Sequence, residues 1–151
     1  MPKIYTIDSE AVVNQPIEKV FEFFSKAENL EKITPDWLKF RIKTPIPIEM
    51  CKGQLIEYEL RLLGLPFTWK TEITEWDPPN RFIDTQIKGP YILWVHEHKF
   101  IDLGATTKML DHVDYSVPGW FLAPVIHKLF VRKKVEAIFK YRSKIIRTLF
   151  K

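Results

Sequence analysis

Seven segments of this chain alternate apolar and polar residues with the period of two that is typical of strands, and six of them follow one another without an intervening helix. Consecutive strands joined by short turns pair antiparallel, so the pattern predicts an antiparallel meander. The expected strands are residues 3–13, 38–43, 54–62, 67–73, 81–88, 91–102 and 106–115.

Two short helices and one long helix complete the prediction. Asn14 is the expected N-cap of a helix with Pro16 in its first turn, and a second short helix over residues 27–33 ends at Thr34-Pro35. Residues 131–149 carry an apolar stripe with helical spacing. Residues 118–130 are out of phase with that stripe, so this segment is either a separate piece or has a second partner.

The composition is typical of one globular domain over residues 1–151, with 46% hydrophobic and 28% charged residues. The predicted strands and helices make it an α+β domain. No signal peptide is recognisable, and the single Cys51 fits a reducing compartment, so we expect a cytoplasmic location.

The net charge of +4 is unevenly distributed. Residues 127–151 hold nine basic residues and one acidic residue, for +8, which leaves −4 for the rest. This basic segment is either a solvated helix face or a peripheral contact with an anionic membrane surface. It lacks the interleaved aromatics of an RNA-binding surface, so we expect no nucleic-acid partner.

One strand carries an unusual mixture of side chains on a single face. In residues 91–102, Trp94, His96, His98 and Phe100 point the same way. Such a face is too polar for an ordinary core and too apolar for solvent. It is typical of the wall of a largely apolar pocket with a few placed hydrogen-bonding groups.

The layout resembles the START-like (SRPBCC) superfamily, in particular its polyketide cyclase/dehydrase-like branch. The resemblance covers essentially the whole chain. It depends on short motifs spread along it: Pro16-x-x-x-Val20-Phe21, Thr34-Pro35-x-Trp37-Leu38, Phe82-x-Asp84-x-Gln86, Gly89-Pro90-Tyr91, Trp94-x-His96-x-His98-x-Phe100, Asp111-x-Val113-x-Tyr115 and Ile138-Phe139-x-Tyr141-Arg142. The resemblance implies a helix-grip fold, in which a curved seven-stranded antiparallel sheet wraps around a long C-terminal helix. It also implies a cavity between them, in a superfamily that includes lipid carriers, hormone receptors and cyclases.

Arg142 lies within the apolar stripe of the last helix, where a guanidinium needs a carboxylate partner. Asp111 shares a face with Met109, Val113 and Tyr115 and is expected to point inward. Asp84 is the other candidate, but the length of the loop around Gly89 decides its face. Arg142 either forms a structural ion pair with one of these carboxylates or binds the anionic group of a ligand.

His96-x-His98 also has a spacing that metals use, with Asp111 or Asp84 as a third ligand. No Cys or His cluster supports such a site, so we expect neither a metal nor a cofactor. No nucleophile elbow, phosphate loop or dinucleotide fingerprint is present.

The resulting prediction is a protein that binds a hydrophobic small molecule, such as a lipid, quinone or polyketide-like compound, as a carrier or sensor. The alternative is a cyclase- or dehydratase-type enzyme that uses an acid–base pair from His96, His98 and Asp111. The oligomeric state is left open. The expected pocket walls are Tyr58, Trp69, Trp94, His96, His98, Asp111, Tyr115 and Arg142.

Overall fold

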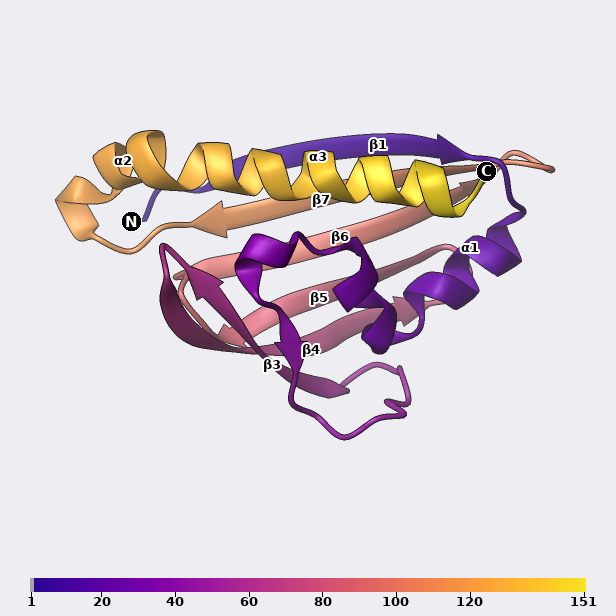
Figure 1. The fold of residues 1–151 in the computed structure, drawn as a ribbon, viewed down its shortest axis with the longest axis horizontal. Helices are drawn as coiled ribbons and strands as arrows, with labels where there is room; N and C mark the ends of the chain where they lie inside the picture. The colour runs from indigo at the N-terminus through magenta and orange to yellow at the C-terminus, as the bar shows by residue number, and fades with distance from the viewer. Residues whose placement is uncertain (1) are drawn as a thin grey trace.

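The computed structural model describes residues 2–151, which form an antiparallel seven-stranded sheet in the order β1-β7-β6-β5-β4-β3-β2. The long helix α3 extends along β1 and β7, and the segment between β1 and β2 covers the other strands (Figure 1). The strands are β1 (Tyr5–Val13), β2 (Arg41–Ile42), β3 (Leu55–Leu62), β4 (Leu65–Asp77), β5 (Arg81–Lys88), β6 (Leu93–Asp102) and β7 (Thr107–Ser116). This confirms the predicted α+β helix-grip fold.

The strand prediction was least accurate at β2. Residues 38–43 were expected to form a strand, but Asp36–Leu38 form a 3-10 turn, η2, and Lys39 follows it in a left-handed conformation with φ of 49°. Only Arg41 and Ile42 then pair with β3. Alternation alone could not reveal this turn, because it does not report the φ of a single residue.

The helices after β1 are α1 (Ile17–Phe24) and the 3-10 helix η1 (Ala27–Ile33). Asn14 was wrongly predicted as the N-cap of α1: Pro16 occupies that position with an extended backbone and no side-chain cap. The Asn14 amide instead donates a hydrogen bond to the Phe150 carbonyl at 3.3 Å, which ties β1 to the C-terminus of the chain.

The change of helical phase near residue 130 has a structural cause. A 3-10 turn η3 (Trp120–Leu122), one turn of α-helix α2 (Ala123–Ile126) and a π-helical turn η4 (His127–Val131) precede α3 (Arg132–Leu149). A π turn has a longer repeat than an α turn, so it rotates the helical faces before and after it relative to each other. The buried stripe of α3 consists of Val135, Phe139, Arg142 and Ile146.

The interior has two hydrophobic clusters. The first, here the aromatic core, surrounds Phe21, Phe82 and Phe100 beneath α1 and includes Met109 and Ile146. The second, here the cavity core, includes Tyr58, Trp69, Trp94, Tyr115 and Phe139. No helix within residues 2–151 is both long enough and apolar enough to cross a membrane.

Candidate functional site

A cavity of about 150 Å³ lies within the cavity core, between the sheet, η1 and α3. A dry apolar cavity of this size holds about one benzene-sized ring. Its apolar walls include Leu30, Ile33, Leu38, Phe40, Ile56, Leu60, Leu62, Ile73, Ile138 and Phe139. Asp84, His96, His98 and Arg142 form a polar wall on β5, β6 and α3, and Lys26, Asn29 and Thr34 add polar groups near η1. The rest of the lining is largely apolar.

Strand register explains which polar groups reach that wall. Asp84 lies opposite His96, and His98 lies opposite Asp111, so all four side chains share the inner face of β5, β6 and β7. The register therefore resolves the face of Asp84, which the sequence left open.

The β5–β6 connection is fixed by Gln86, whose side-chain amide donates to the Tyr91 carbonyl at 2.7 Å and accepts from the Tyr91 amide at 3.3 Å. A Cβ atom at Gly89 would come within 2.4 Å of the Gln86 side chain. Glycine at residue 89 thus allows the close packing that maintains this register.

Asp84, His96, His98 and Asp111 form a closed ring of contacts, here called the tetrad. Nε2 of His96 is 2.7 Å from Oδ1 of Asp111, and Nε2 of His98 is 2.6 Å from Oδ2 of Asp84. The Nδ1 atoms face the opposite carboxylates, at 3.8 Å for His96 and 3.4 Å for His98. The two imidazoles stack with centroids 3.7 Å apart. Every imidazole nitrogen of the tetrad therefore faces a carboxylate.

Burial and the neighbouring charges give His96 and His98 different pKa values. Burial and the positive charge of His98 lower the pKa of His96 from 6.5 to about 4, despite its hydrogen bond to Asp111. Burial also acts to lower the pKa of His98, but its contacts with the Asp111 and Asp84 carboxylates outweigh burial and raise that pKa above 6.5. At pH just below 6.5, His98 is the charged member of the pair and His96 is neutral.

Both carboxylates remain ionised. Burial alone would raise the pKa of Asp84 and of Asp111, but the adjacent histidines outweigh burial and hold both values below 3.8. With His98 protonated, the two negative charges are balanced by His98 and by Arg142 of α3. The polar wall is then close to neutral overall, which fits its burial.

Arg142 is buried at 8% exposure, and its Nη1 atom lies 3.9 Å from Oδ1 of Asp111. Asp111 is thus the carboxylate with which Arg142 forms an ion pair. This contact is too long for a hydrogen bond. Nε and Nη1 of Arg142 have no hydrogen-bond partner, although both atoms are buried. The guanidinium also lies 5.2 Å from the centre of the Phe139 ring.

Trp69 supplies a second buried donor without a partner, its indole Nε1. Its ring stacks against Tyr58 at 5.9 Å and meets Trp94 edge-on at 5.3 Å. Burial and the charge of Asp84 raise the pKa of Tyr58 well above 10, so its hydroxyl keeps its proton. The aromatic wall of the cavity is therefore rich in donors.

The structure places most, but not all, of the expected site residues at the cavity. Tyr58, Trp69, Trp94, His96, His98 and Arg142 line it. Asp111 and Tyr115 are not among its lining residues, contrary to the expectation. Asp111 is held by the histidines, and the Tyr115 hydroxyl bonds Nε2 of His127 at 2.6 Å near the start of the closing helical segment.

Asp84 and Tyr91 are among the lining residues that were absent from the expected pocket walls. The alternation of residues 81–88 left the face of Asp84 undecided. Tyr91 was expected at the start of a strand over residues 91–102, but β6 begins at Leu93 and Tyr91 lies in the β5–β6 connection. The Gly89-Pro90-Tyr91 motif was the available signal for Tyr91, but it was used only for the resemblance.

The same cluster has the composition of a cation site. Ligand atoms of Asp84, His96 and His98 lie within 4.8 Å of one another, a set that first-row metals accept. The hydrogen bonds of the tetrad already use these atoms, and the Arg142 guanidinium stands 3.9 Å from Asp111. A cation here would replace the proton of His98 and meet the Arg142 charge, so the arrangement suits a proton better than a metal ion.

The seven-stranded antiparallel sheet and the long C-terminal helix, with a cavity between them, place this protein in the START/SRPBCC superfamily. The chain belongs to the family described as polyketide cyclase / dehydrase and lipid transport, whose model matches residues 13–138. No curated protein sequence matches the chain.

Solved structures with the same fold include enzymes. The Zhui aromatase/cyclase from Streptomyces sp. R1128 is 17% identical, with a TM-score of 0.77 over 97% of this chain and 93% of that one. A norcoclaurine synthase from Thalictrum flavum, a point mutant with a transition-state analogue, is 14% identical, with a TM-score of 0.68 over 97% and 96%. A START superfamily protein from Mycobacterium smegmatis is 16% identical, with a TM-score of 0.67 over 95% and 98%. At these identities, the likeness establishes the fold alone.

Proposed function

We propose that this protein binds an apolar small molecule that carries an acceptor oxygen, and that it acts as a carrier or sensor in the cytoplasm. The observation that carries the proposal is the pair of unpartnered donor groups, on Trp69 and Arg142, in the lining of an otherwise apolar cavity. Lipids, quinones and polyketide-like compounds all join an apolar body to a carbonyl or carboxylate.

The unpartnered donors of Trp69 and Arg142 are energetically unfavourable in the protein alone. A buried donor without a partner costs about 1–3 kcal/mol, and more when it is charged. A ligand oxygen that accepts from Trp69 Nε1 or from the Arg142 guanidinium removes that cost on binding. The apolar walls favour the rest of the molecule. One ring fits the cavity of about 150 Å³ as it stands, and a longer ligand requires the cavity to widen.

The tetrad favours binding over catalysis. A general base must present a free lone pair to the substrate. The nitrogens of His96 and His98 face Asp84 and Asp111 at 2.6–3.8 Å instead. In this arrangement, the charged groups of the tetrad bind one another and the neighbouring Arg142 rather than a substrate.

A cyclase- or dehydratase-type enzyme is the second candidate. The observation that favours it is that His98 and Asp84 line the cavity as a pair joined at 2.6 Å. A protonated His98 is a potential acid, and the ionised Asp84 is a potential base. In this candidate, His96 and Asp111 orient the reacting pair rather than touching the substrate.

A series of matched ligands tests the binding proposal: naphthalene, 2-acetylnaphthalene and 2-naphthoate, followed by quenching of tryptophan fluorescence. All three carry the same two rings, so each requires the same widening of the cavity and their affinities differ through the acceptor oxygen. We expect the two acceptor-bearing compounds to bind at least about tenfold more tightly than naphthalene. Arg142→Met should remove the preference for naphthoate, and Trp69→Phe should weaken the ketone. Equal affinities for all three compounds in the wild-type protein would contradict the proposal.

The matched control is Arg81→Met. Arg81 pairs with Glu97 at 3.0 Å and does not line the cavity, so its loss should leave all three affinities unchanged.

Native mass spectrometry of the protein purified from its own host separates the two candidates. A carrier retains a co-purified ligand of constant mass. A new product that forms on incubation and disappears in His98→Gln would instead favour the enzyme.

A further inference from the structure

One end of the molecule collects exposed apolar side chains from four separate segments. Because the sheet is antiparallel, the start of β1, the β3–β4 turn, the β5–β6 connection and the exit of β7 all meet there. In Figure 1 this is the end that holds the N-terminus and α2. Its exposed apolar residues are Ile4, Leu63, Leu65, Ile87, Ile92, Trp120, Phe121, Leu122, Val125, Leu129 and Phe130. These residues are here called the apolar end.

The segment between β7 and α3 contributes the largest side chains. Trp120 is 87% exposed and Phe121 is 71% exposed, and their rings contact each other at 5.3 Å. Gly119 and Trp120 both have positive φ values, 119° and 51°, and the second is costly for a tryptophan. An exposed pair of aromatic rings on such a turn is not explained by packing within this chain.

The charge of the apolar end indicates which kind of partner it fits. Residues 2–6, 61–65, 87–92 and 114–136 together hold seven basic residues and two acidic ones, against 16 and 17 in the rest of the chain. Both acids have partners: Asp114 accepts from Thr6 at 2.7 Å, and Glu136 pairs with Arg132 at 3.0 Å. The apolar end is therefore also the positively charged end of the protein.

We propose that the apolar end docks on the surface of an anionic lipid bilayer. Tryptophan and phenylalanine favour the interface between headgroups and acyl chains, and surrounding lysines and arginines bind the anionic headgroups. Leu62 and Tyr91, which line the cavity, directly precede the exposed Leu63 and Ile92. Docking would thus bring lipid close to the cavity, but the proposal holds whether or not the cavity binds a ligand.

Vesicle sedimentation tests the proposal with the full chain and two kinds of vesicle, phosphatidylcholine alone and phosphatidylcholine mixed with phosphatidylserine. We expect binding to the mixed vesicles only, weakened by added salt, with a blue shift of tryptophan emission. Trp120→Ser combined with Phe121→Ser should lower the partition coefficient at least about tenfold. Leu103→Ser, an exposed apolar residue at the opposite end of the sheet, is the control and should change nothing.

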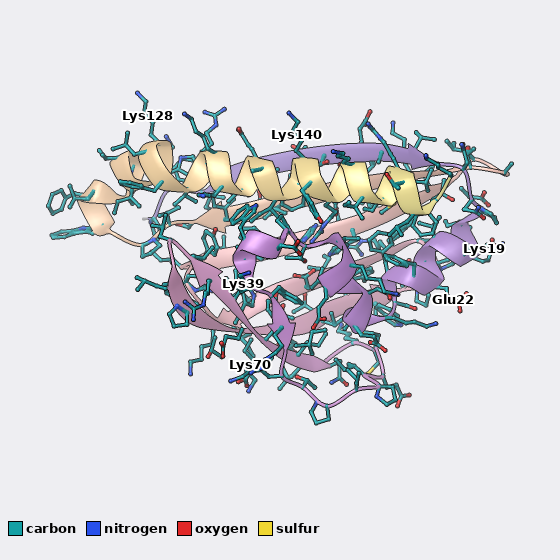
Figure 2. The ribbon with its side chains drawn as sticks, in the orientation of Figure 1. Lys19, Glu22, Lys39, Lys70, Lys128 and Lys140 are labelled. Carbon is teal, nitrogen blue, oxygen red and sulfur yellow. The ribbon has the colours of Figure 1, made fainter. Side chains whose placement is uncertain are left out.

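A charge-reversal pair isolates the electrostatic part. Lys128 lies beside α2, whereas Lys19 lies on α1 at the far end of the molecule (Figure 2). Lys128→Glu should weaken binding to the mixed vesicles about tenfold, and Lys19→Glu should leave it unchanged. Equal effects of the two changes, or no binding to either vesicle, would overturn the proposal. So would a dimer in sedimentation equilibrium that the Trp120→Ser/Phe121→Ser variant converts to a monomer, since a second copy would then cover this end.

Discussion

The aromatic core and the cavity core are built on the same face of the same sheet, yet the cavity is lined mainly by the cavity core, and the part of the aromatic core around Phe21 and Phe100 does not reach it. Around Phe21, rings of Phe82 and Phe100 pack edge to face with centroids 6.1 and 5.3 Å away. Around Trp69, the rings belong to Tyr58, Trp94 and Tyr91, and they surround a cavity. Tyrosine, tryptophan and histidine rings face the cavity beside Phe40, Phe82 and Phe139, whereas Phe21 and Phe100 do not reach it.

The difference shows how the lining of this cavity differs from an ordinary core. Phenylalanine has no polar atom to satisfy, so dense packing is its lowest-energy arrangement. Tyrosine, tryptophan and arginine carry donors, and here some remain unpaired beside the cavity. His98 marks the boundary, because it stacks on Phe82 at 4.1 Å on one side and on His96 at 3.7 Å on the other.

The largest effect is expected in the aromatic core. Phe100→Ala should lower the free energy of unfolding by about 3–5 kcal/mol, because the removed ring leaves a new void among packed neighbours. Tyr58→Ala should cost clearly less, although both residues are under 9% exposed, because part of the Tyr58 ring already faces the cavity. Urea denaturation measures both. Equal costs would show that the cavity core is as tightly packed as the aromatic core.

The second-largest effect on stability is expected when the charge balance of the polar wall is changed. Arg142→Met should cost about 3 kcal/mol, because Asp84 and Asp111 would then share only the His98 charge in a buried site. Part of the loss should be recovered as the pH falls from 7 toward 5, since a net negative tetrad takes up a proton on His96.

The double variant Arg142→Met/Asp111→Asn is the control for this interpretation. It removes one charge of each sign, so the second change should restore most of the stability lost in the first. If the two costs simply add, Arg142 does not balance the tetrad and acts through packing alone.

The third prediction uses pH to separate the two stacked histidines. The signal of the His96 ring in NMR spectra should titrate near pH 4, and that of His98 above 6.5, with His96→Gln and His98→Gln variants to assign them. The opposite order, or a common titration near 6.5, would contradict the charge assignment of the tetrad.

The sign of the stability effect follows from the lowered pKa of His96. Between pH 4 and 6.5, the unfolded chain binds a proton at this residue and the folded chain does not, so its contribution makes stability rise with pH in that range. His96→Gln should flatten this rise relative to the wild-type protein. Urea midpoints at pH 4.5 and 6.5 measure the difference.

Much of the fold was predictable because it depends on patterns that extend over many residues. Alternation located six of the seven strands, and the stripe of α3 predicted that Arg142 faces inward. The two short helices after β1 were also predicted within a few residues. Errors occurred where one residue decides the outcome, as at Lys39, whose left-handed conformation shortens β2, and at Pro16, which replaces Asn14 as the N-cap.

The site was only partly predictable for a related reason. The shared face of Trp94, His96 and His98 follows from one strand, but the tetrad requires the registers of β5, β6 and β7 together. The face of Asp84 depends on the loop around Gly89. The missing partners of Trp69 and Arg142 are a property of packing in three dimensions, which no periodicity in the sequence reports.

The smallest effect on stability is expected at Trp69, whose unpaired donor distinguishes the cavity core from the aromatic core. Trp69→Phe removes a buried indole N–H that has no partner and keeps an aromatic ring next to Tyr58 and Trp94. The loss of ring area and the relief of the unpaired donor act in opposite directions, so the free energy of unfolding should change by less than about 1 kcal/mol. Affinity for 2-acetylnaphthalene should nevertheless fall several-fold, while affinity for naphthalene stays the same. Trp76→Phe is the matched control: Trp76 packs beside Phe21 and Phe82, away from the cavity lining, so the change should leave both affinities unaltered. If Trp69→Phe weakens both compounds equally, Trp69 contributes only surface to the cavity, and the selectivity for an acceptor oxygen lies with Arg142 alone.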